Sequence, residues 1–355
     1  MSARESPERL EVAVIGAGQA GLAIGYFLAA RQGRRFVILD GADSIGAAWR
    51  DRWDSLVLFT PRRYDALPGL PFPGDPDGYP ARDEVVAYLE RYAETFALPV
   101  ELGSAVRSIE VRDHAFVLEL DGREVEAEQV VVATGPFQTP RVPGLAGGLA
   151  PEVFQTHSTG YRRAADLPEG TVLVVGGGNT GFQIARELAA THRVHLAVGS
   201  RQTPLPQRVA GRDLFWWLRK TLVLSITAES RLGRKLRTRD VLIGLSPRAI
   251  RRHGVQVRPR AVRAAGRAVG FADGSELEVD AVIWATGFRL DHSWLGQLPL
   301  AHRRGVTETQ GLYFLGLPWQ HTRGSALLGW VEDDAEHLAE HIAAFAAARP
   351  ALVSA

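Results

Sequence analysis

The chain has 355 residues, of which 46% are hydrophobic, 23% charged and 8% aromatic, so it is long enough for two domains and is not typical of a disordered protein. The 41 basic and 40 acidic residues give a net charge of +1, so the overall charge attracts neither nucleic acid nor an anionic membrane, and no nucleic-acid partner is predicted. Cysteine is absent, which excludes disulfides, thiol nucleophiles, iron–sulfur clusters and cysteine-ligated zinc; no metal site is predicted, and redox chemistry needs a bound cofactor.

The start of the chain does not resemble a targeting signal. Residues 1–11 carry charges of both signs and no apolar core, so we predict neither a signal peptide nor a transit peptide, and a cytoplasmic protein. The apolar stretch at residues 213–226 is interrupted by Arg219 and Lys220, and it is shorter than the ~20 residues that a membrane span requires. No transmembrane segment is therefore predicted.

Residues 12–21 read VAVIGAGQAG, a β-branched apolar run followed by three glycines in G-x-G-x-x-G spacing: Gly16, Gly18 and Gly21. A run without proline, residues 22–31, and a second apolar run, residues 36–39, predict strand, turn, helix and strand. In such a unit the glycines allow a tight turn, a close approach of backbone N–H groups to a pyrophosphate, and close helix packing.

Asp40 closes the second predicted strand of this unit. A carboxylate at that position accepts hydrogen bonds from an unphosphorylated ribose. The first unit therefore favours FAD or NAD.

The same pattern recurs at residues 172–181, VLVVGGGNTG, followed by a helical run at residues 182–191 and a strand at residues 195–198. Here Ser200 and Arg201 replace the closing carboxylate. A guanidinium on a 2′-phosphate would favour NADPH over NADH by roughly 10- to 100-fold. The alternative is that Arg201 is a solvated loop arginine.

Two further segments match each other: residues 130–135 read VVVATG and residues 282–287 read VIWATG. Buried strands of this kind leave a parallel sheet close to a nucleotide or at a crossing between domains. They bracket the second glycine unit. We therefore predict an α/β fold of two Rossmann-type dinucleotide-binding domains, with an NADP domain (residues 159–285) inserted into a discontinuous FAD domain (residues 1–158 and 286–355).

Residues 204–217 read PLPQRVAGRDLFWW, a proline-rich turn leading into an aromatic helix. Three interpretations stay open: a core or domain-packing helix, the wall of a substrate channel, and a membrane-surface or oligomer patch.

Together these motifs resemble the flavin-containing monooxygenase family, the class B flavoprotein monooxygenases, and especially its short bacterial NAD(P)-binding branch. The resemblance covers nearly the whole chain and rests on GAGQAG at Gly16, AAWRDRWDSLVLFTPRRYDALPGLPFP at Ala47, ATG at Ala133, HSTGYR at His157, GGGNTG at Gly176, ATGF at Ala285 and GLYFLGLPWQ at Gly311. It implies that NADPH reduces FAD, that the reduced flavin captures O2 as a C4a-(hydro)peroxide, and that this species delivers one oxygen atom to a small organic substrate.

With the two glycine units, the resemblance implies the cofactor-binding residues. Those expected at FAD are Gly16, Gly18, Gln19, Ala20, Gly21, Asp40, Trp49, Arg50, Thr134, Gly135, Gly316 and Gln320. Those expected at NADP are Gly176, Gly178, Asn179, Thr180, Gly181, Ser200 and Arg201. A helix beginning near Ser325 would point its N-terminus at the flavin.

The reaction itself is expected on the flavin, so no side chain is assigned a certain catalytic role. His157 and Tyr161 match the H-x-x-x-Y part of the family fingerprint and are candidates to support the reaction by organising domain closure. The alternative for His157 is a structural histidine with satisfied hydrogen bonds. Pro151 and Val153 replace the fingerprint's Phe and Gly.

Two departures narrow the activity. Pro61 stands where the animal-type amine and sulfide oxygenases carry an asparagine, and RDRWDS at Arg50 lacks the proline of the Baeyer–Villiger branch. Neither substrate class is therefore carried over. The alternatives are an NAD(P)H flavin oxidoreductase or oxidase without oxygen insertion, and a redox-sensing flavoprotein. The sequence does not decide the oligomeric state, and a homodimer is one option.

Overall fold

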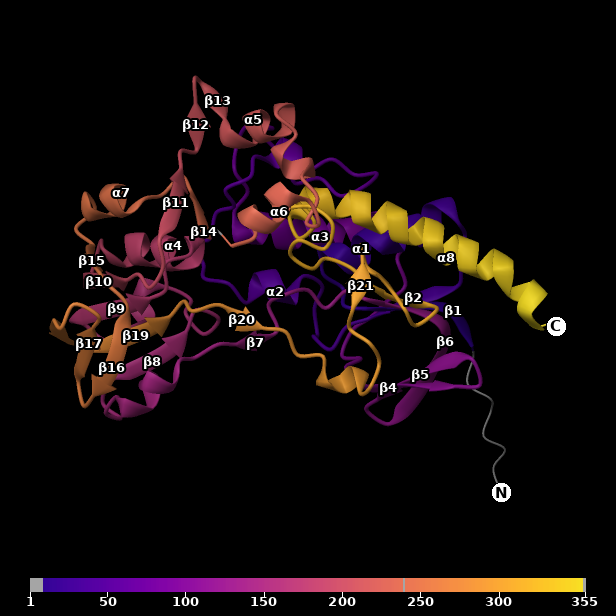
Figure 1. Ribbon diagram of the computed structural model, residues 1–355, viewed down its shortest axis with the longest axis horizontal. Helices are drawn as coiled ribbons and strands as arrows, with labels where there is room; N and C mark the ends of the chain where they lie inside the picture. Colours follow the sequence, from indigo (N-terminus) through magenta and orange to yellow (C-terminus); the bar gives the residue numbers. More distant parts are fainter. Residues whose placement is uncertain (1–8, 239, 354–355) are drawn as a thin grey trace.

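The computed structural model of the protein describes residues 9–238 and 240–353. Within these residues, two large sheets lie at opposite ends of the molecule, with the helix α2 (Ala47–Arg50) between them (Figure 1). The chain runs from the first sheet to the second through β7 (Thr139–Pro140) and returns through β20 (Phe288–Arg289), which pair antiparallel with each other. The predicted α/β fold is confirmed.

The first sheet is built around β1, which pairs parallel with β2 on one side and β6 on the other. Its order is β21-β22-β23-β6-β1-β2-β3, with β5 also pairing β6 and β4 pairing β5. The described strands are β1 (Leu10–Ile15), β2 (Phe36–Leu39), β3 (Val100–Glu101), β4 (Val106–Arg112), β5 (Ala115–Leu120), β6 (Arg123–Val132), β21 (His302–Arg303), β22 (Val306–Thr307) and β23 (Leu312–Phe314).

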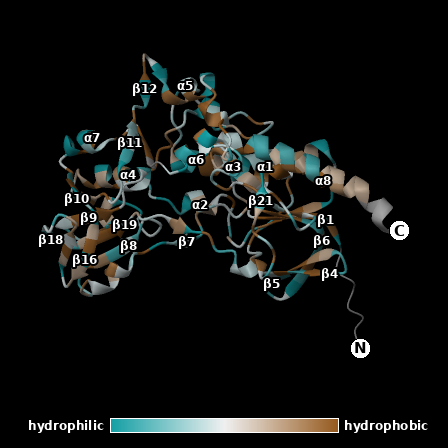
Figure 2. Cartoon of the chain, in the orientation of Figure 1, coloured by the Kyte–Doolittle hydropathy of each residue, from teal (hydrophilic) through white to brown (hydrophobic). Residues whose placement is uncertain are grey.

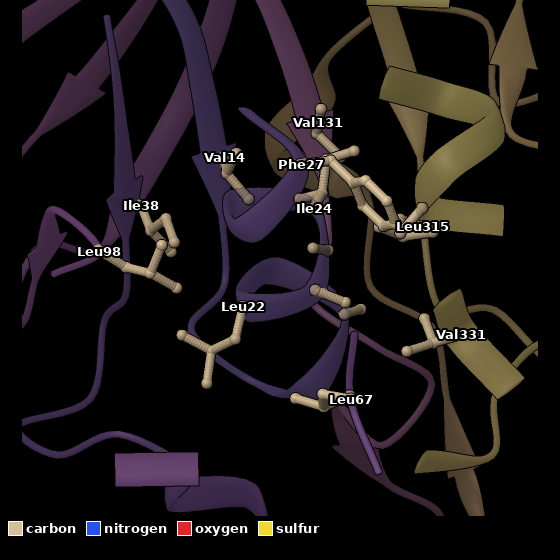
Figure 3. Packing of buried hydrophobic residues seen from close by; sticks show 14 of the residues in the cluster. Val14, Leu22, Ile24, Phe27, Ile38, Leu67, Leu98, Val131, Leu315 and Val331 are labelled. Atoms are coloured by element: carbon tan, nitrogen blue, oxygen red, sulfur yellow. The ribbon is translucent and has the colours of Figure 1, made fainter. Parts of the chain in front are cut away.

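Helices pack on one face of this sheet: α1 (Gln19–Tyr26) with its π-helical extension η1 (Phe27–Arg31), α3 (Arg82–Thr95) and α8 (Val331–Val353). Short 3-10 turns complete this part of the chain: η2 (Arg62–Tyr64), η6 (Ser293–Leu295) and η7 (Leu328–Trp330). Figure 3 shows Ile24 and Phe27 of the first helix beside Val131 of β6 and Leu315. Each such fully buried side chain contributes roughly 1.5–3 kcal/mol, so this core holds the β1–α1 turn rigidly in place.

The second sheet is entirely parallel and has the order β15-β10-β9-β19-β8. Its strands are β8 (Phe154–His157), β9 (Thr171–Val175), β10 (Arg193–Ala197), β15 (Gln256–Arg258) and β19 (Ala281–Trp284). Around it lie η3 (Gly144–Gly148), η4 (Ala164–Asp166), α4 (Asn179–Leu188), β11 (Gln202–Leu205), β14 (Asp240–Ile243), α7 (Pro247–Arg251), β16 (Ala261–Ala265), β17 (Ala268–Phe271) and β18 (Glu276–Glu278). Because β8 pairs with β19, this sheet begins before residue 159; the predicted domain boundaries stay predictions.

The segment at residues 204–217 and the chain that follows it form the hairpin β12 (Arg208–Val209) and β13 (Arg212–Asp213), then α5 (Leu214–Lys220), η5 (Val223–Ser225) and α6 (Arg231–Leu236). Leu214 and Phe215 are buried against a cluster that includes Phe59 and Trp330. One face of this segment is therefore a packing face. No helix in the described part of the chain is both long enough and apolar enough to span a bilayer.

A buried carboxyl group lies beside the first sheet. Asp65 is fully buried, Thr60 donates its hydroxyl to Asp65 Oδ1 at 2.6 Å, and Oδ2 has no partner among the described atoms. Burial raises the pKa of Asp65 to about 7, which the Thr60 hydrogen bond and Arg62 oppose. Ionisation of Asp65 therefore opposes folding.

We expect the contribution of Asp65 to the stability of the protein to fall as the pH rises from about 4 to about 7, because the folded pKa of Asp65 lies above its usual value of ~3.9. Below that window the carboxyl is protonated in both states, and above it the penalty is constant. The substitution Asp65→Asn keeps the acceptor for Thr60 and removes the ionisation, so it should raise the thermal midpoint at pH 8 and not at pH 4. The exposed Asp43→Asn is the control. Equal midpoints for wild type and Asp65→Asn at pH 8 would contradict this expectation.

Candidate functional site

A cavity of about 450 Å³ lies where β1, β2 and β6 end, which is within the usual size range of small-molecule sites. The carboxyl ends of parallel strands at a change of strand order are the usual place for a nucleotide in such folds. Its lining consists of Ile15, Gly16, Gly18, Gln19, Ala20, residues 39–42, residues 46–49, Asp51, Arg52, residues 104–106, residues 133–137, Trp294 and Gly316.

Two glycines of the first turn, Gly16 and Gly21, are packed too tightly for any larger residue. Gly16 has φ +110°, and a Cβ added there would lie 2.7 Å from the carbonyl oxygen of Ala133. A Cβ on Gly21 would collide with the carbonyl of Gly16. The ATG segment after β6 is thus the neighbour against which the glycine turn packs.

The second glycine turn repeats this arrangement. Gly176 has φ +139°, a Cβ added there would collide with the carbonyl of Ala285, and a Cβ on Gly181 would collide with the carbonyl of Gly176. The second ATG segment, after β19, therefore has the same place relative to its glycine turn as the first.

Both helices that follow these turns begin without a side-chain cap. Gly18 and Gly178 are the N-cap residues of α1 and α4, and neither helix has an acidic residue in its first turn. A Cβ on either glycine would have no protein atom within 4 Å. The free N–H groups and the open space above them fit an anionic phosphate group.

Asp40 joins the end of β2 to the first glycine turn. Its Oδ2 accepts a hydrogen bond from Ala17 N at 2.5 Å and its Oδ1 accepts one from Ala42 N at 2.8 Å. Each carboxylate oxygen can accept a further bond, and Asp40 lines the cavity, so the predicted ribose contact fits this geometry.

Other predicted FAD residues also reach the cavity. Trp49 donates its Nε1–H to Gln19 Oε1 at 3.1 Å, and both side chains line the cavity. Gly135 and Gly316 line it with φ +68° and +84°, and Thr134 accepts a hydrogen bond from Gln138.

Apart from Gly21, which packs against Gly16, three expected features do not reach the cavity. Arg50 pairs instead with Glu90 of α3 at 2.6 Å. Gln320 is buried within the protein. Its Nε2 donates to the carbonyl of Phe314, and its Oε1 accepts from Leu317 N. The expected helix start near Ser325 is wrong: Ser325 lies in a turn, its Oγ accepts from His321 N and Thr322 N, and α8 begins at Val331.

Arg52, rather than Arg50, lines the cavity. Its guanidinium lies 4.6 Å from the ring centroid of Phe137 and 5.1 Å from that of Phe288, which belongs to β20. Burial lowers the pKa of Arg52, although a guanidinium stays charged in proteins. Spacing alone would not distinguish these two arginines, since Arg50 ends the short helix α2 and Arg52 follows it by two residues.

The predicted NADP residues of the second turn lie together at the ends of β9 and β10, but Asn179 is engaged within the protein. Its Nδ2 donates to the carbonyl of Val241 and its Oδ1 accepts from Ile243 N, both at 3.0 Å. Thr180 follows it at the start of α4, and Ser200 and Arg201 are exposed beyond β10.

Arg260 was not predicted and lies beside these residues. It donates to the carbonyl of Gly199 at 2.7 Å. It is thus a second guanidinium near the position expected for a 2′-phosphate.

His157 and Tyr161 lie outside the cavity, at the crossing between the sheets. His157 contacts the carbonyl of Gly287 through Nε2 at 3.1 Å, while Nδ1 accepts from Thr159 N. Burial lowers the pKa of His157, which favours the neutral ring. The His157 ring packs edge-on against the ring of Phe288, which is also the ring that the Arg52 guanidinium contacts.

Tyr161 is buried and donates to Glu187 of α4 at 2.8 Å. The adjacent Arg162 donates to the carbonyls of Arg50 and Arg52 and pairs with Asp51 at 3.0 Å. Tyr161 contacts the second sheet's helix α4, and Arg162 contacts the end of α2 and the loop after it. The H-x-x-x-Y segment and Arg162 therefore have a positioning role.

Known proteins with similar sequences and folds include nucleotide-dependent oxidoreductases. A sequence profile described as pyridine nucleotide-disulphide oxidoreductase matches residues 13–310. The chain belongs to this family. It is also 44% identical over 343 residues to an uncharacterised oxidoreductase, CzcO-like, of Geobacillus kaustophilus, covering 94% of this chain and 98% of that protein.

Monooxygenases are among its relatives. The solved flavin-containing monooxygenase from Stenotrophomonas maltophilia is 32% identical with a TM-score of 0.78, covering 95% of this chain and 99% of that one. The rice indole-3-pyruvate monooxygenase YUCCA1 is 31% identical, covering 88% of each chain. The resemblance to flavin-containing monooxygenases is confirmed, and these relatives support a flavin-dependent monooxygenase.

The family name includes disulphide oxidoreductases, but this member has no cysteine with which to exchange a disulfide. It is an FAD- and NAD(P)H-dependent oxidoreductase whose relatives include flavin monooxygenases.

Proposed function

We propose that the protein is an NADPH-dependent FAD monooxygenase that inserts one atom of O2 into a small organic substrate. We further propose that the NADP domain, residues 159–285, is an insertion in the FAD domain. The observation that carries this proposal is the pair of matched glycine turns, each packed against an ATG carbonyl and each leading into an uncapped helix.

The residues of the first turn would hold FAD. The N–H groups at the start of α1 would bind the pyrophosphate, and Asp40 would accept a ribose hydroxyl while holding the turn through Ala17 and Ala42. When bound, FAD would supply the redox chemistry. NADPH would provide two electrons, one atom of O2 would enter the substrate, and the other atom would leave as water.

Arg52 is the proposed positioning residue between the two cofactors. Its guanidinium lines the first cavity and stacks on Phe288, whose neighbour Gly287 is held by His157. This contact connects the cavity to the turn after β19. A cation there would stabilise negative charge in a largely buried site.

A second cavity, of about 620 Å³, is our candidate for the approach of substrate. It includes Leu58 and Phe59, which precede Pro61 in the chain, and the polar Gln183 and Arg186 of α4. The mixture of apolar walls and a few polar groups suits a small organic molecule.

NADPH selectivity is a local expectation. Arg201→Ala should raise the KM for NADPH roughly 10- to 100-fold more than that for NADH, because a charge-assisted contact to the 2′-phosphate is lost. Steady-state kinetics with both cofactors measures this. Arg260→Ala, which removes the second guanidinium near this position, is measured in the same way for comparison. Equal losses for NADPH and NADH in Arg201→Ala would show that Arg201 does not contact the 2′-phosphate.

Oxygen insertion is tested with ¹⁸O2 and a panel of amines, sulfides, ketones and aromatic 2-oxo acids, the last because of the name of the rice relative. The proposal predicts a substrate that accelerates NADPH oxidation and gains one labelled atom. If every compound leaves all electrons in hydrogen peroxide, the protein is an oxidase or reductase instead.

A further inference from the structure

Residues 208–238, which we name the basic projection, stand out from the rest of the molecule in charge. They contain eight Arg and Lys side chains and only two carboxylates, a net charge of +6, whereas the whole chain carries +1. Both lysines of the chain, Lys220 and Lys235, lie here. In Figure 1 the hairpin and α5 extend beyond the body of the protein.

The two carboxylates neutralise little of this charge. Asp213 faces inward, where it accepts from Phe215 N, Tyr79 and Gln207, and Glu229 lies 3.8 Å from Arg303 of the body. Within the described part of the chain, Arg219, Lys220, Arg231, Lys235 and Arg237 have no carboxylate within ion-pair distance.

Apolar side chains are exposed among these cations. Leu222 is 68% exposed, Leu232 51% and Val209 41%. Trp216 is half-buried, with Arg212 at 5.5 Å and Lys220 at 5.9 Å from its ring. Figure 2 shows hydrophobic and hydrophilic segments alternating along this projection.

The projection is held in a fixed shape. Ala210 and Gly211 both have positive φ, which makes a tight hairpin turn, and Trp217 donates its Nε1–H to the carbonyl of Val209 at 2.9 Å. The packing of Leu214 and Phe215 anchors it to the body. The exposed groups of the hairpin and α5 are thus held on one packed element.

We propose that the basic projection docks the protein on an anionic lipid bilayer, as a peripheral contact. Tryptophan and leucine enter the interfacial layer of a membrane, and nearby arginine and lysine bind acidic headgroups. The exposed aliphatic side chains at the hairpin and after α5 favour a bilayer over a nucleic acid, whose phosphates would contact the cations alone.

The test is sedimentation of the full protein with vesicles of phosphatidylcholine alone or mixed with phosphatidylglycerol, at low and high salt. We expect binding to the anionic vesicles only and its loss at high salt. The double variant Arg219→Gln, Lys220→Gln should bind roughly 10- to 30-fold more weakly. The control Arg107→Gln, Arg123→Gln removes two positive charges from the edge of the first sheet and should bind as wild type does.

Leu222→Asn tests the apolar part separately, because asparagine tolerates the left-handed backbone at φ +57°. It should weaken vesicle binding and leave NADPH oxidation in solution unchanged. Equal binding of neutral and anionic vesicles, wild-type binding by the Arg219 and Lys220 variant, or binding of single-stranded DNA in place of vesicles would overturn the proposal.

Discussion

Alanine at Gly18 should reduce FAD affinity while leaving NADPH binding intact, and alanine at Gly178 should do the reverse. Both glycines have backbone angles that alanine adopts, and neither Cβ would meet a protein atom within 4 Å. Any loss must then come from the space above the helix N-terminus, where each phosphate would lie. We expect at least a tenfold loss of affinity, about 1.4 kcal/mol, in each case.

The two variants control for each other. Flavin absorbance after gel filtration measures FAD retention, and quenching of protein fluorescence measures NADPH binding to the flavin-free protein. Gly147→Ala, a remote glycine whose Cβ also meets nothing, should change neither. If Gly18→Ala and Gly178→Ala weakened the same cofactor, the two-site account would be wrong.

Loss of the Asp40 carboxylate should have the second large effect. Asp40→Ala leaves Ala17 N and Ala42 N without their acceptor and removes the expected ribose contact. Hydrogen bonds to a charged group contribute about 1.5–3 kcal/mol each, so we expect FAD affinity to fall at least tenfold and the thermal midpoint to drop. Titration of the flavin-free protein with FAD gives the first quantity.

Asp43→Ala is the matched control, because Asp43 is an exposed carboxylate three residues further on. Asp40→Asn should be intermediate, since its amide keeps one acceptor oxygen. Unchanged FAD affinity in Asp40→Ala would remove Asp40 from the cofactor site.

Local patterns predicted the nucleotide units well because their residues interact over short distances. Residues 36–39 were expected as a strand and form β2, and residues 22–31 fall within α1 and its π-helical extension. The two ATG segments were expected close to a nucleotide or at a crossing between domains, and the structure packs Ala133 and Ala285 directly against the glycine turns. Glycines with positive φ and collisions at a Cβ leave the sequence little choice at these positions.

Long-range contacts were harder to predict. Whether Arg50 or Arg52 enters the cavity depends on Glu90 of α3 and Phe288 of β20, which are distant in sequence. The helix expected near Ser325 starts later because Ser325 Oγ closes a local turn with His321 and Thr322. Arg260 reaches Gly199 only because β15 pairs with β10. None of these contacts has a periodicity or spacing that the chain could reveal by itself.

The most direct test of the account is to reduce the purified, FAD-containing protein with NADPH without oxygen, mix it with O2, and record the flavin absorbance in a stopped-flow instrument. For a flavin-dependent monooxygenase we expect NADPH to reduce the flavin rapidly. After mixing with O2, a transient absorbance spectrum that differs from those of reduced and oxidised flavin should precede the return of the oxidised form. Protein that retains no FAD, or FAD that NADPH does not reduce, would contradict the account.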